Sequence, residues 1–352
     1  MGLCSHESPA KTGHPADLRS LLSRVGHTPM RPIQLRIGGL RHTVWLKMEG
    51  ANPGGSSKDR TALGLVQDLE SRGRLLPDSI LVESTSGNLG VALALISRAK
   101  GYRFLAVVDP KIPSEILERM IQSGAIIDRV IEPDGSGGYL LSRLQRVRQI
   151  CDSSPRFVWP NQYENPANPA IHLHTTAPEI DAQMENQLDA VFVAVSTGGT
   201  LAGVGRYFRQ HRPNVLVIGV DAAGSVVFGG APSPRKLNGI GSARRSSFLT
   251  PLDYHSHMVA GDSEAFAFCR FLRERTGISV GGSSGAVLSA CSRYIAGHPQ
   301  IRRTVCLCAD DGDNYGSSIF SDTWLQRNGL SHPSLPACVE DAWLEHSAGC
   351  VP

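Results

Sequence analysis

The sequence predicts an α/β fold whose sheets are mostly parallel and covered by helices on both faces. Short apolar runs such as ILVES (80–84) and AVFVAVS (190–196) alternate with longer amphipathic segments. These runs are apolar throughout rather than at every second position, which is typical of strands buried on both faces. At 352 residues, with 41% hydrophobic and 19% charged residues, the chain is long enough for about two domains.

The individual elements follow in order along the chain. Strands are expected where short apolar runs occur, at 44–49, 80–84, 104–109, 125–131, 190–196, 215–221 and 304–308. Helices are expected where apolar residues recur with the helical period, at 59–72, 89–101, 114–123, 138–151, 200–211, 263–275 and 285–296. Gly101 and Gly124 end two of these helices. Residues 331–352 have weak periodicity and are expected to form a loosely ordered tail.

Composition and charge argue against several classes of function, including nucleic-acid binding and membrane transport. The formal net charge is only +3 and aromatic residues make up 6%, so no nucleic-acid partner is expected. The chain has no apolar run long enough to cross a membrane and no signal-peptide pattern near its start. The start Met1-Gly2 resembles a myristoylation signal, but His6 stands where that signal has Ser or Thr. With scattered cysteines in apolar surroundings, these features predict a cytoplasmic enzyme with reduced thiols.

No metal site is expected. Pairs of potential ligands occur, but each pair lacks the companion residues that a metal site needs. The pairs are Cys306/Cys308, His172/His174 and His255/His257.

Four turns rich in Gly, Ser and Thr lie at the starts of predicted helices: 52–60, 84–90, 196–200 and 281–285. An open α/β sheet gathers its ligand site where such turns follow the carboxyl ends of strands. Lys58 lies at a helix start, where the helix dipole favours the neutral, nucleophilic amine. The backbone N–H groups of the other turns suit carboxylate or phosphate. Taken singly, each turn also has a plain structural interpretation. Lys58 could be a solvated lysine at a helix terminus, and the other turns could be ordinary helix starts.

The segment 281–285 also matches the G-x-S-x-G nucleophile elbow of serine hydrolases. A hydrolase would need an acid and a histidine later in the chain. The candidates are Asp310, Asp311 and Asp313, with His332 or His346. Both histidines fall in the weakly periodic tail and no HGGG-type segment is present, so the hydrolase hypothesis is disfavoured.

Together and in order, NPGGSSKDR, STSGNLG, STGGT and GGSSGA resemble the β-family (fold type II) of pyridoxal-phosphate enzymes, which includes cysteine synthase and cystathionine β-synthase. The resemblance covers about residues 24–325. It implies a tryptophan synthase β-like fold with two three-layer αβα domains, pyridoxal 5'-phosphate as cofactor, and a homodimer. The implied division is a small domain at 51–164, a large cofactor-binding domain at 15–50 plus 165–330, and the tail at 331–352.

The resemblance also implies roles for individual residues. Lys58 would form the Schiff base with the cofactor and then act as general base. Asn88 would bond the phenol oxygen of the ring, and Ser283 would face the pyridine nitrogen. The cofactor phosphate would be held by Ser196, Thr197, Gly198, Gly199 and Thr200, and the substrate carboxylate by Thr85, Ser86 and Gln162. A hydroxyl at the pyridine nitrogen leaves it neutral, which suits expulsion of a β-leaving group better than transamination.

Several stretches are similar to a narrower group, the N-(2-amino-2-carboxyethyl)-L-glutamate synthases, which make a 2,3-diaminopropionate precursor for siderophores and peptide antibiotics. These stretches include VDPKI (108–112), NQYENP (161–166) and YGSSIFSDTWL (315–325). The resemblance implies O-phospho-L-serine as donor, L-glutamate as acceptor, release of phosphate and an aminoacrylate intermediate.

Two residues are candidates for the substrate pocket of such a synthase. Arg143 would bind the departing phosphate or an acceptor carboxylate, and Tyr163 would border the acceptor pocket. A solvated helix face and a packed core tyrosine are the plain alternatives. The loop at 239–241, with Arg244 and Arg245 beyond it, is a candidate to close over the substrate, with surface charge as its alternative.

Two departures leave the acceptor open. Gly198 stands where the siderophore enzymes tend to have Thr, and positions 311 and 314 lack the Arg residues that those enzymes can carry. A cysteine synthase that uses sulfide with O-phosphoserine or O-acetylserine is therefore an alternative, as is another small nucleophile. Intact Lys58, Asn88 and Ser283 argue against a non-catalytic homologue.

Overall fold

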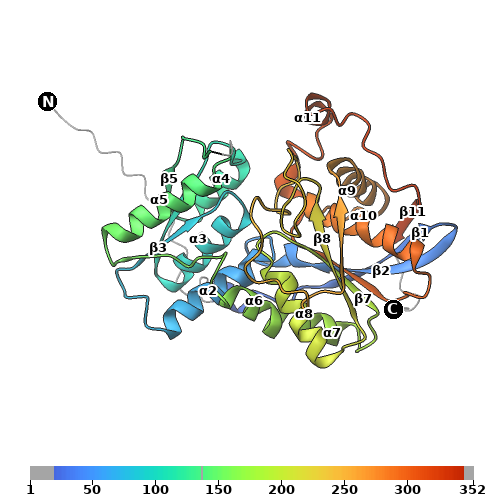
Figure 1. Cartoon of the computed structure of the whole chain (residues 1–352), viewed down its shortest axis with the longest axis horizontal. Coiled ribbons are helices and arrows are strands. Elements are labelled where there is room, and N and C mark those ends of the chain that lie inside the picture. Colours follow the sequence, from blue (N-terminus) through green and yellow to red (C-terminus); the bar gives the residue numbers. More distant parts are fainter. Residues whose placement is uncertain (1–19, 136–137, 345–352) are drawn as a thin grey trace, which may run out of the picture.

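The computed structural model describes residues 20–135 and 138–344, which form two lobes, each built around its own β-sheet (Figure 1). The seven-stranded sheet contains, in spatial order, β11 (Val339–Leu344), β1 (Met30–Ile37), β2 (Leu40–Met48), β10 (Thr304–Cys308), β7 (Ala190–Ala194), β8 (Leu216–Ala222) and β9 (Ser256–Ala260). The four-stranded sheet contains β5 (Ala125–Arg129), β4 (Arg103–Val108), β3 (Ile80–Ser84) and β6 (Phe157–Val158). β1 is antiparallel to both neighbours and all other pairings are parallel, which confirms the predicted fold class.

Helices flank both sheets. The smaller lobe contains α2 (Lys58–Ser71), α3 (Asn88–Lys100), α4 (Ser114–Gln122) and α5 (Leu140–Ser153). The larger lobe contains α6 (Ala167–Ile171), α7 (Ala177–Gln183), α8 (Gly199–His211), α9 (Asp262–Thr276), α10 (Gly282–Gly297) and α11 (Asp322–Arg327). Short helical turns occur at η1 (Glu49–Ala51), η2 (His172–Thr176) and η3 (Asp313–Tyr315).

The cores lie on both faces of each sheet, as continuous apolar strands require. In the central strand β10, Cys306 packs into the core formed with α9 and α10, whereas the adjacent Val305 packs into the core formed with α7 and α8. In β3, Leu81 packs with α2, α3 and α4, whereas Val82 packs with α5. Both central strands are therefore buried throughout, and only their ends are available to a ligand.

Several elements escaped the sequence prediction because their patterns are not apolar runs. β1 buries every second residue, including Ile33 and Leu35, and β9 has a similar alternation. The segment 167–183 forms α6, η2 and α7, although Pro169 and Asn168 in α6 favour helix poorly.

The structure also differs from the predicted tail at 331–352. Residues Val339–Leu344 form β11, which pairs with β1 at the edge of the large sheet. Val339 and Ala342 are buried there, while Glu340 and Asp341 between them give the segment a polar character. Met1, Gly2, Cys4, His6, His346 and Cys350 lie outside the described residues.

Apart from β11, the strands of the two sheets lie within the segments that the predicted domains contain. All four strands of the smaller sheet come from residues 80–158, inside the range 51–164 predicted for the small domain. The exact boundaries, including the assignment of 15–50 and 165–330 to the large domain, stay a prediction.

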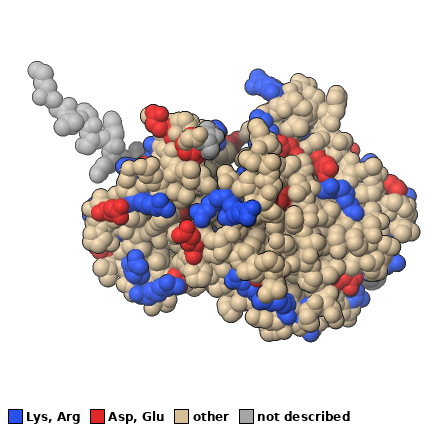
Figure 2. All heavy atoms as spheres, in the orientation of Figure 1, with Lys and Arg blue, Asp and Glu red and all other residues tan. Residues whose placement is uncertain are grey.

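The molecular surface carries charges of both signs. On the face drawn in Figure 2, Lys and Arg side chains are intermixed with Asp and Glu over both lobes, and no continuous basic surface covers that face. None of the helices that the structure describes is long and apolar enough to span a membrane.

A buried ion-pair network joins the start of α2 to the larger lobe. Arg60 is 1% exposed and contacts Glu49 through Nε at 2.8 Å and Glu179 on α7 through Nη2 at 2.7 Å. Lys47 on β2 also contacts Glu179, at 2.9 Å. Because Arg60 lies two residues after Lys58, this network fixes the position of the predicted catalytic amine.

The network generates a stability prediction at Glu179. Burial alone would raise the pKa of Glu179, but hydrogen bonds from Arg60 and Lys47 outweigh it and lower the pKa from 4.5 to about 2. We expect Glu179→Gln to lower the free energy of unfolding at pH 7 by about 3 kcal/mol, measured by urea unfolding. The folded-state pKa lies below the unfolded value, so the stabilisation is present above pH 4.5 and is lost as the pH falls toward 2.

The exposed pair Arg270–Asp322 provides the matched control, because the Asp322 side chain is 79% exposed. Asp322→Asn should change the free energy of unfolding by less than about 1 kcal/mol. Equal losses for the two variants, or a Glu179→Gln loss that persists at acid pH, would contradict the assigned role of the network.

Candidate active site

Three of the four predicted turns meet at the junction between the two sheets. Asn88 at the start of α3 donates from Nδ2 to Asp310 Oδ2, just after β10, at 2.8 Å. Ser57 N donates to the carbonyl of Ala309 at 2.8 Å, and Gly281 N donates to the carbonyl of Asp310 at 3.3 Å. Turns that are far apart in sequence are thus joined around the carboxyl end of the central strand, as expected for an open α/β sheet.

Lys58 is the first residue of α2 and is partly exposed. Burial lowers the pKa of Lys58 from its usual value, although the negative charges of Asp310 and Glu49 oppose the shift. A lowered pKa increases the share of neutral amine at physiological pH. The amine is therefore prepared to act as a nucleophile or a base.

The turn 84–90 lies beside Gln162. The Gln162 side chain is buried and donates from Nε2 to the carbonyl of Ser84 at 3.1 Å. Thr85 is buried and Ser86 is partly exposed, one and two residues further along the turn. The structure thus gathers the three residues predicted to hold a carboxylate at the N-terminus of α3, where backbone N–H groups lack helical partners.

The turn 196–200 leads directly into α8, and its backbone is closely packed. Gly198 has φ +93°, and a Cβ on Gly199 would lie 2.0 Å from Asn168 Oδ1. Asn168 Nδ2 donates to Thr197 Oγ1 at 3.2 Å, and Thr200 Oγ1 lies 3.3 Å from His172 Nε2. The two glycines allow the backbone N–H groups at the α8 N-terminus to face an anion at close range.

The same turn is tied to the loop at 239–241. Ser196 Oγ donates to the carbonyl of Gly241 at 3.2 Å, and Gly241 N donates to the carbonyl of Val195 at 2.7 Å. The Ser196 hydroxyl is therefore partly committed to the protein, while Thr197, Gly198, Gly199 and Thr200 present the helix N-terminus.

Ser283 lies in the first turn of α10 and is buried, as is the adjacent Ser284. Ser284 lies beside the buried thiol of Cys308 on β10 and shares a hydrogen bond with it. The hydrolase hypothesis requires His332 or His346. Of these, His332 lies within the described residues and is exposed in the segment before β11. This placement favours a ligand-facing role for the α10 N-terminus over a nucleophile elbow.

Arg143 and Tyr163 lie at the smaller lobe's side of the junction. Arg143 is 8% exposed, its Nε lies 3.2 Å from Asp109 Oδ2, and its Nη1 has no partner among the described residues. Burial raises the pKa of Tyr163, and the charges of Arg143, Glu83 and Arg244 all act on it. Arg143 is thus a buried cation with unused donors rather than part of a solvated helix face.

Arg244 crosses from the larger lobe to this group. Its guanidinium carbon lies 5.2 Å from the centre of the Tyr163 ring, and Nη2 lies 3.3 Å from Glu164 Oε1. Ser247 Oγ donates to the carbonyl of Tyr163. The segment after the 239–241 loop therefore covers Tyr163.

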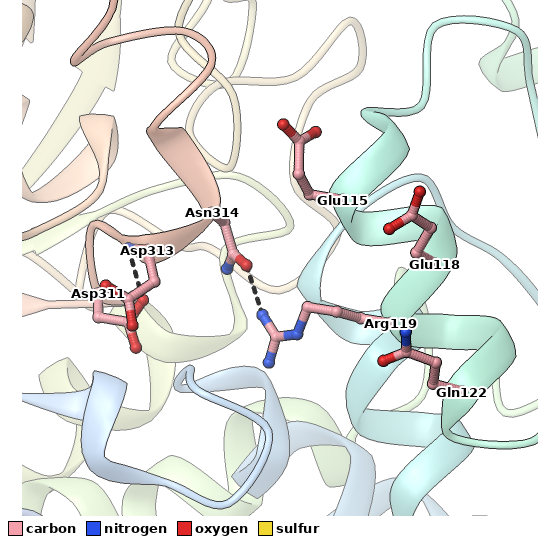
Figure 3. A pocket seen from close by; sticks show the side chains of 7 residues that line it. All are labelled: Glu115, Glu118, Arg119, Gln122, Asp311, Asp313 and Asn314. Atoms are coloured by element: carbon pink, nitrogen blue, oxygen red, sulfur yellow. Dashed lines mark hydrogen bonds between the residues drawn. The ribbon is translucent and has the colours of Figure 1, made fainter.

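A cavity of about 430 Å³ lies between α4 and η3, beside the junction (Figure 3). Arg119 points from α4 across this space and donates to Asn314 Oδ1 at 2.6 Å and to the carbonyl of Gly54 at 2.9 Å. The remaining lining residues are Glu115, Glu118, Gln122, Asp311 and Asp313. The cavity is thus predominantly acidic, with one arginine already bonded to the protein.

The described residues contain no group of three or more His, Cys, Asp or Glu side chains arranged to hold a metal ion. His172 instead contacts hydroxyls, with Thr61 Oγ1 at 3.1 Å from Nε2 and Thr176 Oγ1 at 2.8 Å from Nδ1. Burial, and then the charge of Lys58, lowers the pKa of His172 well below its usual value. This histidine is a neutral structural group next to the turn 196–200.

Asp310 was not predicted to be part of this site; it was predicted only as a possible acid of a serine hydrolase. A signal was available, because Asp310 follows the buried run TVCLC at the carboxyl end of a predicted strand. Asn168 and Tyr315 were missed as well, and no local pattern marks them.

The junction fits pyridoxal phosphate in its donor set. It offers an amine of lowered pKa, and a glycine-lined helix N-terminus suited to a phosphate. It also holds a buried polar atom without a partner among the described residues, Asp310 Oδ1. Buried polar atoms without a partner are costly, so such atoms indicate a ligand that satisfies them or compensates for them.

Comparison with known proteins agrees with this fit. A family described as "Pyridoxal-phosphate dependent enzyme" matches residues 21–310. The N-(2-amino-2-carboxyethyl)-L-glutamate synthase of Ralstonia nicotianae is 41% identical over 309 residues, which are 88% of this chain and 91% of that protein.

Solved structures of related proteins share the overall fold. O-ureido-L-serine synthase superposes with a TM-score of 0.78 at 32% identity, covering 87% of this chain and 98% of that one. The O-acetylserine dependent cystathionine beta-synthase of Helicobacter pylori superposes with a TM-score of 0.77 at 31% identity, covering 85% and 97%.

Proposed function

Because the chain belongs to the pyridoxal-phosphate dependent enzyme family, we propose that it forms N-(2-amino-2-carboxyethyl)-L-glutamate from O-phospho-L-serine and L-glutamate. The reaction replaces the phosphate on the β-carbon of the donor with the amine nitrogen of the acceptor. The observation that carries this proposal is the similarity, over most of the chain, to the Ralstonia synthase.

Lys58 is the proposed catalytic residue. Bound pyridoxal phosphate supplies an aldehyde that combines with amines and a ring that withdraws electrons from the α-carbon of an amino acid. The Lys58 amine, with its lowered pKa, takes the proton from the substrate α-carbon and later returns it. We propose that Asn88, Ser283 and the turn 196–200 hold the ring and the phosphate of the cofactor.

The donor is proposed to bind at the smaller lobe. Its carboxylate would lie on Thr85, Ser86 and Gln162 at the N-terminus of α3, where the helix dipole favours an anion. Arg143 would bind the departing phosphate, because it is nearly buried and has donors without partners among the described residues. Phosphate release would then be assisted by neutralisation of its charge.

The acceptor is proposed to approach between Tyr163 and Arg244. Arg244 lies over the ring of Tyr163, and Ser247 bonds the Tyr163 backbone, so the segment can exclude water from the reacting centre. Arg244 and Arg143 act on Tyr163 together and offer positive charge for the carboxylates of glutamate. The acceptor amine loses one proton as its nitrogen bonds to the β-carbon, and the released phosphate takes up that proton.

A second acceptor class has one observation in its favour. The cavity between α4 and η3 contains Asp311, Asp313, Glu115 and Glu118, and these carboxylates would repel a dicarboxylate entering from that side. Sulfide or another small nucleophile would not require cations there. The second candidate is therefore a cysteine synthase.

Finer properties of the enzyme belong to the same proposal. We propose a homodimer that works in the cytoplasm and supplies a precursor of 2,3-diaminopropionate for siderophore biosynthesis. The support is the similarity to the family and to the Ralstonia synthase.

A product assay tests the acceptor. The holoenzyme is incubated with O-phospho-L-serine and either L-glutamate or sulfide, and products are measured by mass spectrometry together with released phosphate. We expect the amino-carboxyethyl adduct of glutamate and little cysteine. Cysteine without the glutamate adduct would remove the synthase proposal, and Lys58→Ala should form neither product.

Arg143 generates a prediction about the donor. Arg143→Ala should reduce kcat/KM with O-phospho-L-serine by about tenfold or more, because charge-assisted bonds to the phosphate are lost. The loss with O-acetyl-L-serine should be smaller, because that leaving group carries no phosphate. Arg148→Ala, on the exposed face of the same helix, is the matched control and should affect neither donor. Equal losses for both donors in Arg143→Ala would show that Arg143 does not bind phosphate.

A further inference from the structure

We propose that Asp310 is a positioning residue that fixes the amide of Asn88 toward the cofactor. Asp310 follows β10, the middle strand of the large sheet, and is 2% exposed. This inference rests on the proposed cofactor contact of Asn88 but on neither proposed substrate.

The geometry restricts the Asn88 side chain to one orientation. Asp310 Oδ2 accepts from Asn88 Nδ2 at 2.8 Å and from Tyr315 Oη at 2.6 Å. An ionised carboxylate is only an acceptor, so the amide must turn its NH₂ group, and not its oxygen, toward Asp310. One N–H is used in this bond, and the second N–H is thereby held in a defined direction for a phenol oxygen.

The carboxylate itself is held from several directions. An added Cβ on Gly281 would lie 2.1 Å from Asp310 Oδ1, so that glycine leaves the space that the carboxylate occupies. Asp310 also forms a backbone bridge with Ser56, two residues before Lys58. A single residue therefore contacts three of the four Gly-rich turns.

The electrostatics are consistent with a positioning role. Burial raises the pKa of Asp310 to about 6, although hydrogen bonds from Tyr315 and Asn88 oppose the shift. Asp310 is therefore mostly ionised at pH 7, and its charge raises the pKa of Lys58 against the effect of burial. The titratable groups that interact with Asp310 are Lys58 on α2, Tyr315 on η3, Asp311, Cys269 on α9 and Cys308 on β10.

A double-mutant cycle on cofactor affinity tests the proposal. Apoenzyme of the wild type, Asp310→Ala, Asn88→Ala and the double variant is titrated with pyridoxal phosphate, without any substrate. We expect each single variant to weaken binding by about tenfold and the double variant to be no more than about threefold weaker than either. Independent effects, in which the two factors multiply, would overturn the proposal, as would unchanged affinity in Asp310→Ala.

Asp311 provides the matched control, because it is the adjacent carboxylate and does not contact Asn88. Asp311→Ala should leave cofactor affinity within about twofold of the wild type. Since no substrate is present, an error in the proposed acceptor leaves this outcome unaffected.

A milder pair of variants covers the case in which Asp310→Ala does not fold. In the holoenzyme, Asp310→Asn removes the charge with little change of shape, and the pH midpoint of the visible absorbance should move to lower pH. The reason is that a nearby carboxylate stabilises the protonated, positively charged form of the Lys58 nitrogen. Asp311→Asn should leave the midpoint in place. An unmoved midpoint in Asp310→Asn, or equal shifts in both variants, would overturn the proposal.

Discussion

The buried ion pairs of Arg60 fix the geometry on which the rest of the site depends. Arg60 joins η1 through Glu49 and α7 through Glu179, so the first turn of α2 cannot move independently of the larger lobe. Lys58 begins that turn. Removing one partner of such a network leaves an uncompensated buried charge, which is far more costly than losing an exposed pair. The amine is therefore placed by electrostatics in the core and not by loop packing alone.

Around this amine, the sheets supply a site for an anionic, ring-shaped ligand. The N-termini of α3 and α10 meet at the end of β10, and α8 begins after the neighbouring parallel strand β7. A glycine precedes the first residue of each of these helices. Helix N-termini favour negative charge, and glycine allows close approach of the backbone. Arg143 adds a nearly buried guanidinium, with a donor that has no partner among the described residues, near the turn 84–90 that is proposed to bind the substrate.

Much of this arrangement could be predicted from the sequence, and the remainder has identifiable physical reasons. Strands such as Ile80–Ser84 and Thr304–Cys308 were predictable because burial on both faces leaves an uninterrupted apolar run. β11 was not, because an edge strand buries only every few residues and resembles a polar tail. Lys58 and Asn88 lie in local patterns, and Asp310 follows a predictable strand. The hydrogen bonds from Asn88 to Asp310 and from Asn168 to Thr197 join distant segments, and no local pattern encodes them.

The central claim is that Lys58 is the amine that reacts with pyridoxal phosphate. Borohydride reduction of the holoenzyme, followed by proteolysis and mass analysis of the peptides, tests it most directly. The account predicts one phosphopyridoxyl group per chain, on the peptide that contains Lys58. A label on another lysine, such as Lys47 or Lys236, or no label at all, would contradict it.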